Sequence, residues 1–262
     1  MIKAKKSLGQ NFLTDHVVIN RILEVINPKL EERFFEIGSG RGELTKIFVP
    51  RVKNIESVEI DKYLMPELRR LELSSKNLKI YQENVIKITL KNLSKDNFKY
   101  RVIGNLPYNL SSKIMLWSFQ NSSHISDIHF MFQKEFGNRL ISSPGKKSYG
   151  RLSVLSQYMF KNLYLFEISP ESFKPKPSVK SVFIKFIPRE NRDVNSSEAL
   201  LLQDITKIMF SKRRKKISTS CKDILNHDDF IELGINPDDR PESLSVEDFV
   251  KITNYLLINK NG

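Results

Sequence analysis

The stretch FFEIGSGRGELT, residues 34–45, decides the fold, because an apolar strand-like run passes through three glycines into a helix-like run. Glycines at positions 38, 40 and 42 allow the backbone to turn sharply and to approach a ligand at the end of a strand. A dinucleotide fingerprint would have its third glycine at position 43, where this chain has Glu43, so the pattern is G-x-G-x-G. The stretch therefore indicates the first strand, turn and helix of an α/β sheet.

Two acidic residues near this turn suggest what it binds. Glu36 precedes the first glycine by two positions, and Glu59 ends the next strand-like run. An acid beside the turn suits a cationic ligand better than a pyrophosphate, and a carboxylate one βα unit later can accept both hydroxyls of a ribose. An adenosine with a cationic amino-acid tail, such as S-adenosylmethionine, fits both. A tight structural turn in an unrelated α/β protein remains the alternative.

Strand-like and helix-like runs alternate outward from this stretch. The strand-like runs are 33–37, 55–60, 78–81, 100–104, 127–133, 163–168 and 181–186, and the helix-like runs are 42–52, 62–73, 111–119 and 134–141. This alternation predicts a Rossmann-like α/β domain with a mostly parallel sheet and helices on both faces. The last two strands have no helix between them, so we expect them to form an antiparallel hairpin.

The sequence becomes polar near PRENRDVNSS (188–197), and no strand-like runs follow. Apolar residues then recur at helical spacing, at positions 200, 201, 205, 208 and 209 and in the runs 217–225, 230–233 and 246–257. We therefore expect residues 1–190 to form the α/β domain and residues 191–262 to form a small all-helical domain.

Composition limits the partners and the compartment. The 262 residues carry a formal net charge of +13, which favours nucleic acid or an anionic membrane surface. Cys221 is the single cysteine, and no Cys/His set has metal-ligand spacing, so we expect a reducing compartment and no metal. The basic N-terminus lacks the apolar run of a signal peptide, and no other run is long enough to span a membrane. We expect a cytoplasmic protein.

Several motifs occur together in a specific order. They are SLGQNFLTD, EIGSGRGELT, VEID, NLPYN, FMFQKE, YGRLSVLSQY, FKPKPSVKS and FSKRRKKI. From about Lys5 to the C-terminus, this series resembles the KsgA-type ribosomal RNA adenine dimethyltransferases. The related macrolide-resistance methyltransferases share the N-terminal motifs, but not FSKRRKK or the closing GINPDDRPESLSVEDF.

The resemblance implies a set of cofactor-binding residues. The GQNF segment of the family folds over S-adenosylmethionine, so Asn11 and Leu13 are expected to contact it, with help from Gln10. Gly38 is expected to lie under the methionine part, and Glu59 is expected to bind the ribose.

One position departs from the family pattern. The family usually has an aspartate after the third strand that contacts the adenine amino group, and this chain has Asn84 there. An amide oxygen can accept the same hydrogen bond, without the assistance of a charge. The neighbouring Glu83 would point to the opposite side if the strand conformation continued.

NLPYN, residues 105–109, follows a strand-like run and would present an amide and an aromatic ring to an adenine. By the resemblance, the Asn105 side-chain oxygen and the Leu106 carbonyl accept both hydrogens of the target amine, and Asn105 also lies at the cofactor. Pro107 fixes the turn and Tyr108 stacks on the base, with Phe173 of ESFKPKPSVKS as a second ring. The alternatives are an Asn-Pro loop with a surface tyrosine and a buried loop phenylalanine.

The block KRRKK is the strongest local charge signal. Its residues can neutralise several RNA phosphates, and Lys146 and Lys147 are weaker candidates. A solvated charged face is the alternative. The residues of the block are Lys212, Arg213, Arg214, Lys215 and Lys216.

The expected function combines these signals. By resemblance, the chain uses S-adenosylmethionine, releases S-adenosylhomocysteine, and dimethylates the N6 amines of two adjacent adenosines near the 3′ end of small-subunit (16S) ribosomal RNA. The expected partner is that RNA within an assembling 30S particle, and the chain is expected to be monomeric. A non-catalytic RNA-binding ribosome-assembly factor is the alternative from another class. A nicotinamide dehydrogenase is disfavoured by Glu43 at the third glycine position.

Overall fold

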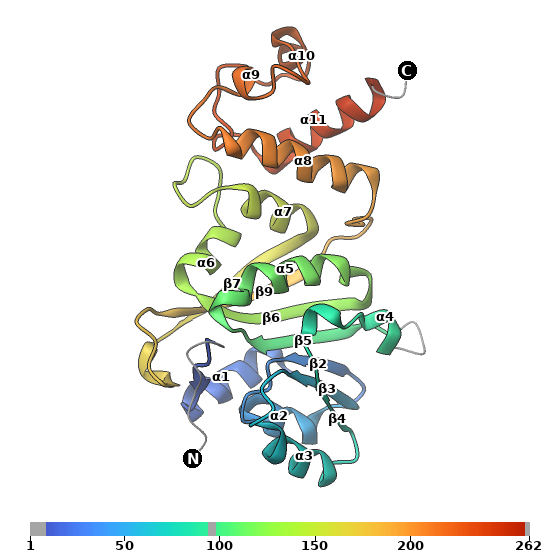
Figure 1. Ribbon diagram of the computed structural model, residues 1–262, viewed down its shortest axis with the longest axis vertical. Helices are drawn as coiled ribbons and strands as arrows, with labels where there is room; N and C mark the ends of the chain where they lie inside the picture. The colour runs from blue at the N-terminus through green and yellow to red at the C-terminus, as the bar shows by residue number, and fades with distance from the viewer. Residues whose placement is uncertain (1–8, 94–97, 260–262) are drawn as a thin grey trace. The chain divides into compact units, whose positions relative to one another are not determined.

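The computed structural model describes residues 9–93 and 98–259, and Figure 1 shows their arrangement into helices and strands. The basic residues at the N-terminus, including Lys5 where the family resemblance begins, lie outside the described residues. The chain forms two compact units, Met1–Gly137 with Leu163–Pro188, and Asn138–Asn162 with Arg189–Gly262. Residues 138–162 thus belong to the second unit, whereas the sequence placed them in the first domain; the functional division at residue 190 stays a prediction.

A seven-stranded sheet organises the first unit. Its strand order is β4-β3-β2-β5-β6-β9-β7. The pairs among β2 to β6 are parallel, and β9 pairs with β6 antiparallel. β7 and β9 are neighbours in this sheet, and the strands are β2 (Arg33–Ile37), β3 (Asn54–Glu59), β4 (Leu78–Gln82), β5 (Tyr100–Asn105), β6 (Ile125–Gln133), β7 (Phe160–Ile168) and β9 (Ser181–Pro188).

Helices connect the parallel strands, as the alternating pattern predicted. The connecting helices are α2 (Glu43–Phe48), α3 (Met65–Leu73), α4 (Leu90–Leu93), which the pattern did not predict, and α5 (Ser111–Gln120). The predicted helix α6 (Lys134–Leu140) follows β6. The predicted helix 62–73 begins only at Met65, because the backbone N–H of Leu64 bonds to the Asp61 carbonyl in a turn. Pro66 then occupies the first helical turn, where its missing N–H leaves no bond unmade.

Helix α1 (His16–Ile26) is not among the predicted elements, although its signals are present in the sequence. The Asp15 side chain accepts hydrogen bonds from the backbone N–H groups of Val17 and Val18, which is a standard N-terminal cap. Its buried residues recur every three or four positions, at Ile19, Ile22 and Ile26.

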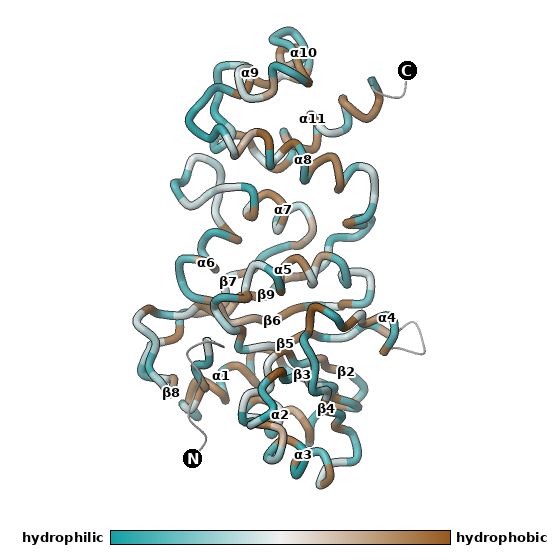
Figure 2. Tube along the Cα trace, viewed as in Figure 1, coloured by the Kyte–Doolittle hydropathy of each residue, from teal (hydrophilic) through white to brown (hydrophobic). Residues whose placement is uncertain are grey.

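The main core of the first unit lies between this helix, α2 and the sheet. Phe34 of β2 packs on Phe48 of α2, with ring centroids 4.9 Å apart, and Ile55 of β3 is fully buried in the same cluster. Figure 2 shows hydrophobic stretches along β5 and β6. Because β2 to β6 are parallel, their carboxyl ends lie at one edge of the sheet.

The second unit is helical, as expected. It contains α7 (Arg151–Met159), α8 (Ser197–Ser211), α9 (Ile217–Ser220), α10 (His227–Glu232) and α11 (Val246–Asn259). α8 and α11 pack together, with the rings of Phe210 and Phe249 stacked 5.8 Å apart. The predicted apolar stripe of α8 was partly wrong, because Leu200 is 52% exposed while Leu202 takes the buried face. No helix in the described part of the chain is long and apolar enough to cross a membrane.

Candidate active site

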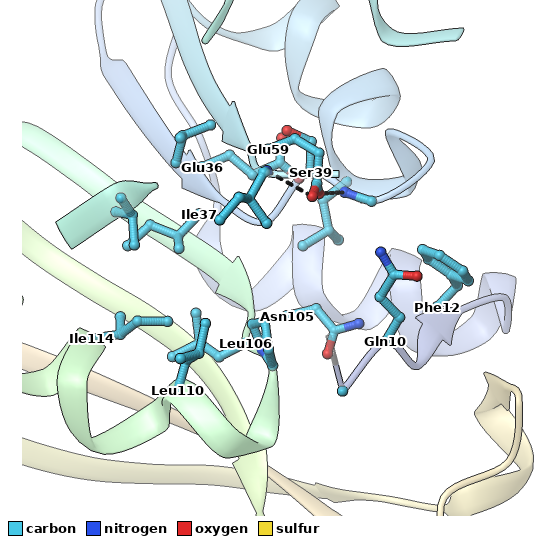
Figure 3. Close-up of a pocket in the computed structure, with 18 of the residues that line it drawn as sticks. Gln10, Phe12, Glu36, Ile37, Ser39, Glu59, Asn105, Leu106, Leu110 and Ile114 are labelled. Carbon is cyan, nitrogen blue, oxygen red and sulfur yellow. Dashed lines mark hydrogen bonds between the residues drawn. The ribbon is translucent and has the colours of Figure 1, made fainter. Parts of the chain in front are cut away.

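A pocket opens at the carboxyl ends of β2, β3, β4 and β5, all within the first unit (Figure 3). Its lining comes from residues 9–13, 36–40, 43–44, 58–60, 83–85, 105–107, 110 and 114. The glycine turn, the end of β3 and the start of NLPYN therefore meet in one place. This is the edge at which open α/β sheets bind their ligands.

The glycine turn has the backbone conformation that only glycine adopts without strain. Gly38, Gly40 and Gly42 have φ angles of 72°, 60° and 79°. A Cβ on Gly38 would lie 3.8 Å from the Asn105 carbonyl oxygen, so the turn and the end of β5 are in close contact. Any side chain at Gly38 would reduce the space between these two walls of the pocket.

Glu59 is fixed at the end of β3 and is only 6% exposed. Its Oε2 accepts the backbone N–H of Gly40 at 2.9 Å, and its Oε1 accepts those of Ile60 and Asp61 at 2.8 and 2.9 Å. A carboxylate has about four acceptor positions, so one position remains for a ligand hydroxyl. Burial raises the pKa of Glu59, and the three backbone hydrogen bonds oppose this rise.

Glu36 is a second buried carboxyl group in the lining. Its Oε2 accepts the Thr45 hydroxyl at 2.5 Å and the Ser57 hydroxyl at 2.7 Å. Burial raises the pKa of Glu36 to about 7, while the two hydroxyl hydrogen bonds act in the opposite direction. A cation bound in the pocket would favour the ionised form, because an opposite charge nearby lowers the pKa of a carboxyl group.

Residues 9–13 form a strap along the pocket. The Gln10 side-chain amide donates to Asp61 Oδ2 at 2.9 Å, just beyond the end of β3. The Asn105 side-chain amide donates to the Asn11 carbonyl oxygen at 2.8 Å, at the end of β5. Asn11 and Leu13 both line the pocket, where the resemblance placed them. The strap is thus fastened at two strand ends of the sheet.

The strap is also fastened to the loop that carries Phe173. β1 (Phe12–Leu13) pairs antiparallel with β8 (Phe173–Lys174), so that Leu13 lies opposite Phe173. The Ser172 hydroxyl adds a bond to Asp15 Oδ2 at 2.9 Å. Phe173 is 1% exposed in the hydrophobic core and is not among the lining residues. Phe173 is therefore part of the core beside the strap, and its role as a second ring at the base stays a prediction.

NLPYN begins with the last residue of β5 and contributes three residues to the lining. The Asn105 amide nitrogen is held by the strap, which leaves Oδ1 as the acceptor of that side chain. Leu106 and Pro107 follow, and the Pro107 carbonyl accepts the backbone N–H of Leu110 at 3.0 Å. Tyr108 is half-buried outside the pocket lining, with its hydroxyl 2.8 Å from Ser181 Oγ.

Asn84 lies in the lining, as does its neighbour Glu83. β4 ends at Gln82, so the strand alternation that would have separated the two side chains does not continue. Asn84 Oδ1 accepts the backbone N–H of Ile86 at 3.1 Å and caps a short turn. The amide oxygen keeps one lone pair for a ligand amine.

The basic block follows α8 in the second unit, and its residues differ in their surroundings. Arg213 donates from Nε to Glu242 at 2.6 Å and from Nη2 to the Lys147 carbonyl at 2.8 Å, so it holds two loops together. Lys216 pairs with Asp238 at 2.8 Å. The other three side chains are exposed and form no ion pair within the described residues: Lys212, Arg214 and Lys215.

Sequence reasoning gave no role to several residues that shape the site. Asp61 holds the strap, Thr45 and Ser57 bind Glu36, and Ser181 contacts Tyr108. Asp61 could have been found, because it ends the quoted VEID motif. The other three meet their partners only through the fold. Among residues 9–93 and 98–259, no group of three or more His, Cys, Asp or Glu side chains could hold a metal ion.

The sheet order, together with a glycine turn beside a carboxylate that can bind a ribose, Glu59, defines the class of the protein as a Rossmann-like methyltransferase. The chain matches the family described as "Ribosomal RNA adenine dimethylase" over residues 1–257, and it belongs to this family. It is therefore a methyltransferase enzyme of a family that uses S-adenosylmethionine.

Curated relatives and solved structures are similar over nearly the whole chain. Proteins named "Ribosomal RNA small subunit methyltransferase A" from Marinomonas sp. (strain MWYL1) and Coxiella burnetii (strain CbuG_Q212) are each 40% identical, over 260 and 252 residues. These alignments cover 99% and 96% of this chain and 97% of each relative. A dimethyladenosine transferase from Plasmodium falciparum has a TM-score of 0.80 at 24% identity, covering 96% of this chain and 98% of that one. The 23S rRNA methyltransferase ErmE has a TM-score of 0.75 at 20% identity, covering 94% and 99%. The two structures support the fold.

Proposed function

We propose that this chain dimethylates the N6 amines of two adjacent adenosines near the 3′ end of small-subunit ribosomal RNA. Family membership supports adenine dimethylation of ribosomal RNA, and the names of the curated relatives support the small subunit. One observation carries the proposal at the level of the site. Asn105 and Leu106, the expected acceptors for the target amine, line the same pocket as the glycine turn and Glu59.

The pocket residues fit S-adenosylmethionine, which supplies a methyl group on a positively charged sulfur when it is bound. Glu59 keeps one acceptor position for a ribose hydroxyl, and Glu36 provides a buried carboxylate for the cationic tail. Asn84 Oδ1 accepts from the adenine amine. Gly38 leaves room between the turn and β5, and the strap residues Asn11 and Leu13 exclude water from one side.

The end of β5 prepares the target amine. The exocyclic amine of adenine is a poor nucleophile, because its lone pair is delocalised into the ring. Asn105 Oδ1 and the Leu106 carbonyl accept its two N–H hydrogens and favour a pyramidal nitrogen with a localised lone pair. Both acceptors are in place before the positive charge develops on that nitrogen, so they stabilise it without reorganisation.

The remaining roles concern the base and the rest of the RNA. Tyr108 stacks on the extruded adenine, as aromatic side chains do for bases taken out of a helix. No strong general base is required, because the methylated ammonium loses its proton readily. The basic block of the second unit includes the exposed cations Lys212, Arg214 and Lys215. These cations bind phosphates of an assembling 30S particle. The chain acts as a monomer in the cytoplasm, where such particles are assembled, and releases S-adenosylhomocysteine.

A methyl-transfer experiment separates this function from that of a factor that only binds RNA. The purified chain is incubated with methyl-labelled S-adenosylmethionine and small subunits that lack the modification. Label is expected in the small-subunit RNA. Binding of the subunits with no transfer of label would refute the proposal and favour the non-catalytic factor.

A further inference from the structure

The side chain of Tyr108 is contacted by a residue from another part of the fold. It is the first residue of the short 3₁₀ turn η4 (Tyr108–Leu110), directly after Pro107. Its side chain is half-buried, and its hydroxyl lies 2.8 Å from the Ser181 hydroxyl. The contact with Ser181 holds the far end of the ring.

Ser181 is placed rigidly enough to provide this support. It is the first residue of β9, is fully buried, and pairs with Gln133 of β6 in the antiparallel ladder. The backbone N–H of Lys134 bonds to the Lys180 carbonyl at 2.9 Å, which fixes the chain just before it. The Ser181 hydroxyl therefore takes its position from the sheet, not from the mobile end of a long side chain.

The bond also joins the segment FKPKPSVKS to NLPYN. Ser181 ends the segment FKPKPSVKS, whose Phe173 is buried in the core and pairs with the strap at Leu13. Tyr108 belongs to NLPYN, whose Asn105 is held by the strap at Asn11. A buried hydroxyl that loses its partner is destabilised, so each member of the pair favours the arrangement in which both are satisfied.

We propose that Ser181 is a positioning residue for methyl transfer, and that its hydroxyl holds the Tyr108 ring in the orientation that stacks on the target adenine. This inference rests on the proposed function, because the adenine is the group that the ring receives. Ser181 itself contacts neither the cofactor nor the base. Its effect on the reaction passes entirely through Tyr108.

The test is a double-mutant cycle with Ser181→Ala and Tyr108→Phe, measured as single-turnover methyl transfer on saturating small subunits. Each single variant removes one hydroxyl of the pair and is expected to lower the rate about five-fold, the effect of one hydrogen bond. The double variant is expected to be no slower than either single variant. Affinity for S-adenosylmethionine, measured by calorimetric titration, is expected to be unchanged in all three.

Ser118→Ala is the matched control, because Ser118 is also a fully buried serine in the first unit but bonds to Ile114 of its own helix. It is expected to transfer methyl groups at the wild-type rate. A normal rate in Ser181→Ala, a double variant about 25-fold slower than wild type, or an equal loss in Ser118→Ala would overturn the inference. Failure of the wild-type chain to transfer methyl groups would instead refute the proposed function.

Discussion

Asn105→Ala tests the part of the site that the sequence and the structure describe most fully. The asparagine side chain has two separate tasks. Its amide N–H donates to the Asn11 carbonyl at 2.8 Å and fastens the strap, and its Oδ1 is the proposed acceptor for the target amine. Alanine removes both groups, so it is expected to affect cofactor binding and methyl transfer by different amounts.

The two effects can be estimated separately. Loss of the neutral hydrogen bond to the strap is expected to weaken cofactor binding by about 0.5–1.5 kcal/mol, or roughly two- to thirteen-fold. Loss of a preorganised acceptor at the reacting nitrogen is expected to lower the single-turnover rate by about 10²–10³. Affinity for the RNA should change little, because the base is held mainly by stacking on Tyr108. The rate is therefore expected to fall far more than either affinity.

Calorimetric titration with S-adenosylmethionine and single-turnover transfer on saturating small subunits measure the two effects. Asn109→Ala is the matched control, because Asn109 belongs to the same pentapeptide but is exposed and lies outside the pocket lining. It should stay within a few-fold of wild type in both measurements. If Asn105→Ala transferred methyl groups at the normal rate under saturating conditions, the proposed role of its Oδ1 would be wrong.

Three further predictions follow from the other charged groups. Glu59→Ala should weaken S-adenosylmethionine binding by about 1.5–3 kcal/mol, the scale of hydrogen bonds to a charged group, and unchanged affinity in calorimetry would refute the ribose assignment. Burial raises the pKa of the Glu36 carboxyl group to about 7. The stabilisation that Glu36 gives to the folded protein should therefore be present below pH 4.5 and be lost as the pH rises through about 7. Affinity for the cationic cofactor should rise over the same pH range. Glu36→Gln should flatten both pH profiles, and profiles that keep their shape would argue against this assignment. The basic block includes three exposed cations that form no ion pair within the described residues, Lys212, Arg214 and Lys215. Replacing them with Gln should reduce the slope of log affinity for the subunit against log salt concentration by roughly one unit per lost phosphate contact. An unaltered slope would show that they form a solvated face and do not bind phosphates.

Local patterns predicted the fold well where a single residue or a repeat decides the structure. The three glycines, with positive φ at each, are properties of a short segment and could be read from the sequence. The strands that end at Glu59 and Asn105 were predicted to end within one residue, at 60 and 104. The boundary of α3 was missed by three residues, because a turn closed by Asp61 competes with the helical period. The second unit was predicted as helical, but residues 138–162 could not be assigned to it from local signals.

The structure gathers part of the predicted site in one pocket, while the roles of these residues stay predictions. Motif resemblance placed Asn11, Glu59 and Asn105 in one pocket, where the structure has them. It could not reveal that Asn105 bonds to Asn11 across 94 positions, because such a contact depends on how the strap crosses the strand ends. The burial of Phe173 was equally invisible, since a loop phenylalanine beside prolines has the same local sequence whether it faces the core or a ligand.

The basic block shows the same limit for charged residues. Its five cations are indistinguishable in the sequence, yet Arg213 holds Glu242 and the Lys147 carbonyl, while its neighbour Arg214 is exposed. The ion pair of Arg213 joins two residues that are distant in the chain, so charge patterning alone does not separate this structural cation from those that remain for a polyanion. The structure makes this separation and sharpens the choice of variants.

The most direct test of the central claim is the identity of the product nucleoside. Small subunits that lack the modification are treated with the chain and S-adenosylmethionine, and their ribosomal RNA is digested and examined by mass spectrometry. The account predicts N6,N6-dimethyladenosine at two adjacent positions near the 3′ end of the small-subunit RNA, and much less of it with the Asn105→Ala variant after the same reaction time. Methylation of another base or atom, or no new methylated nucleoside with the wild-type chain, would contradict it.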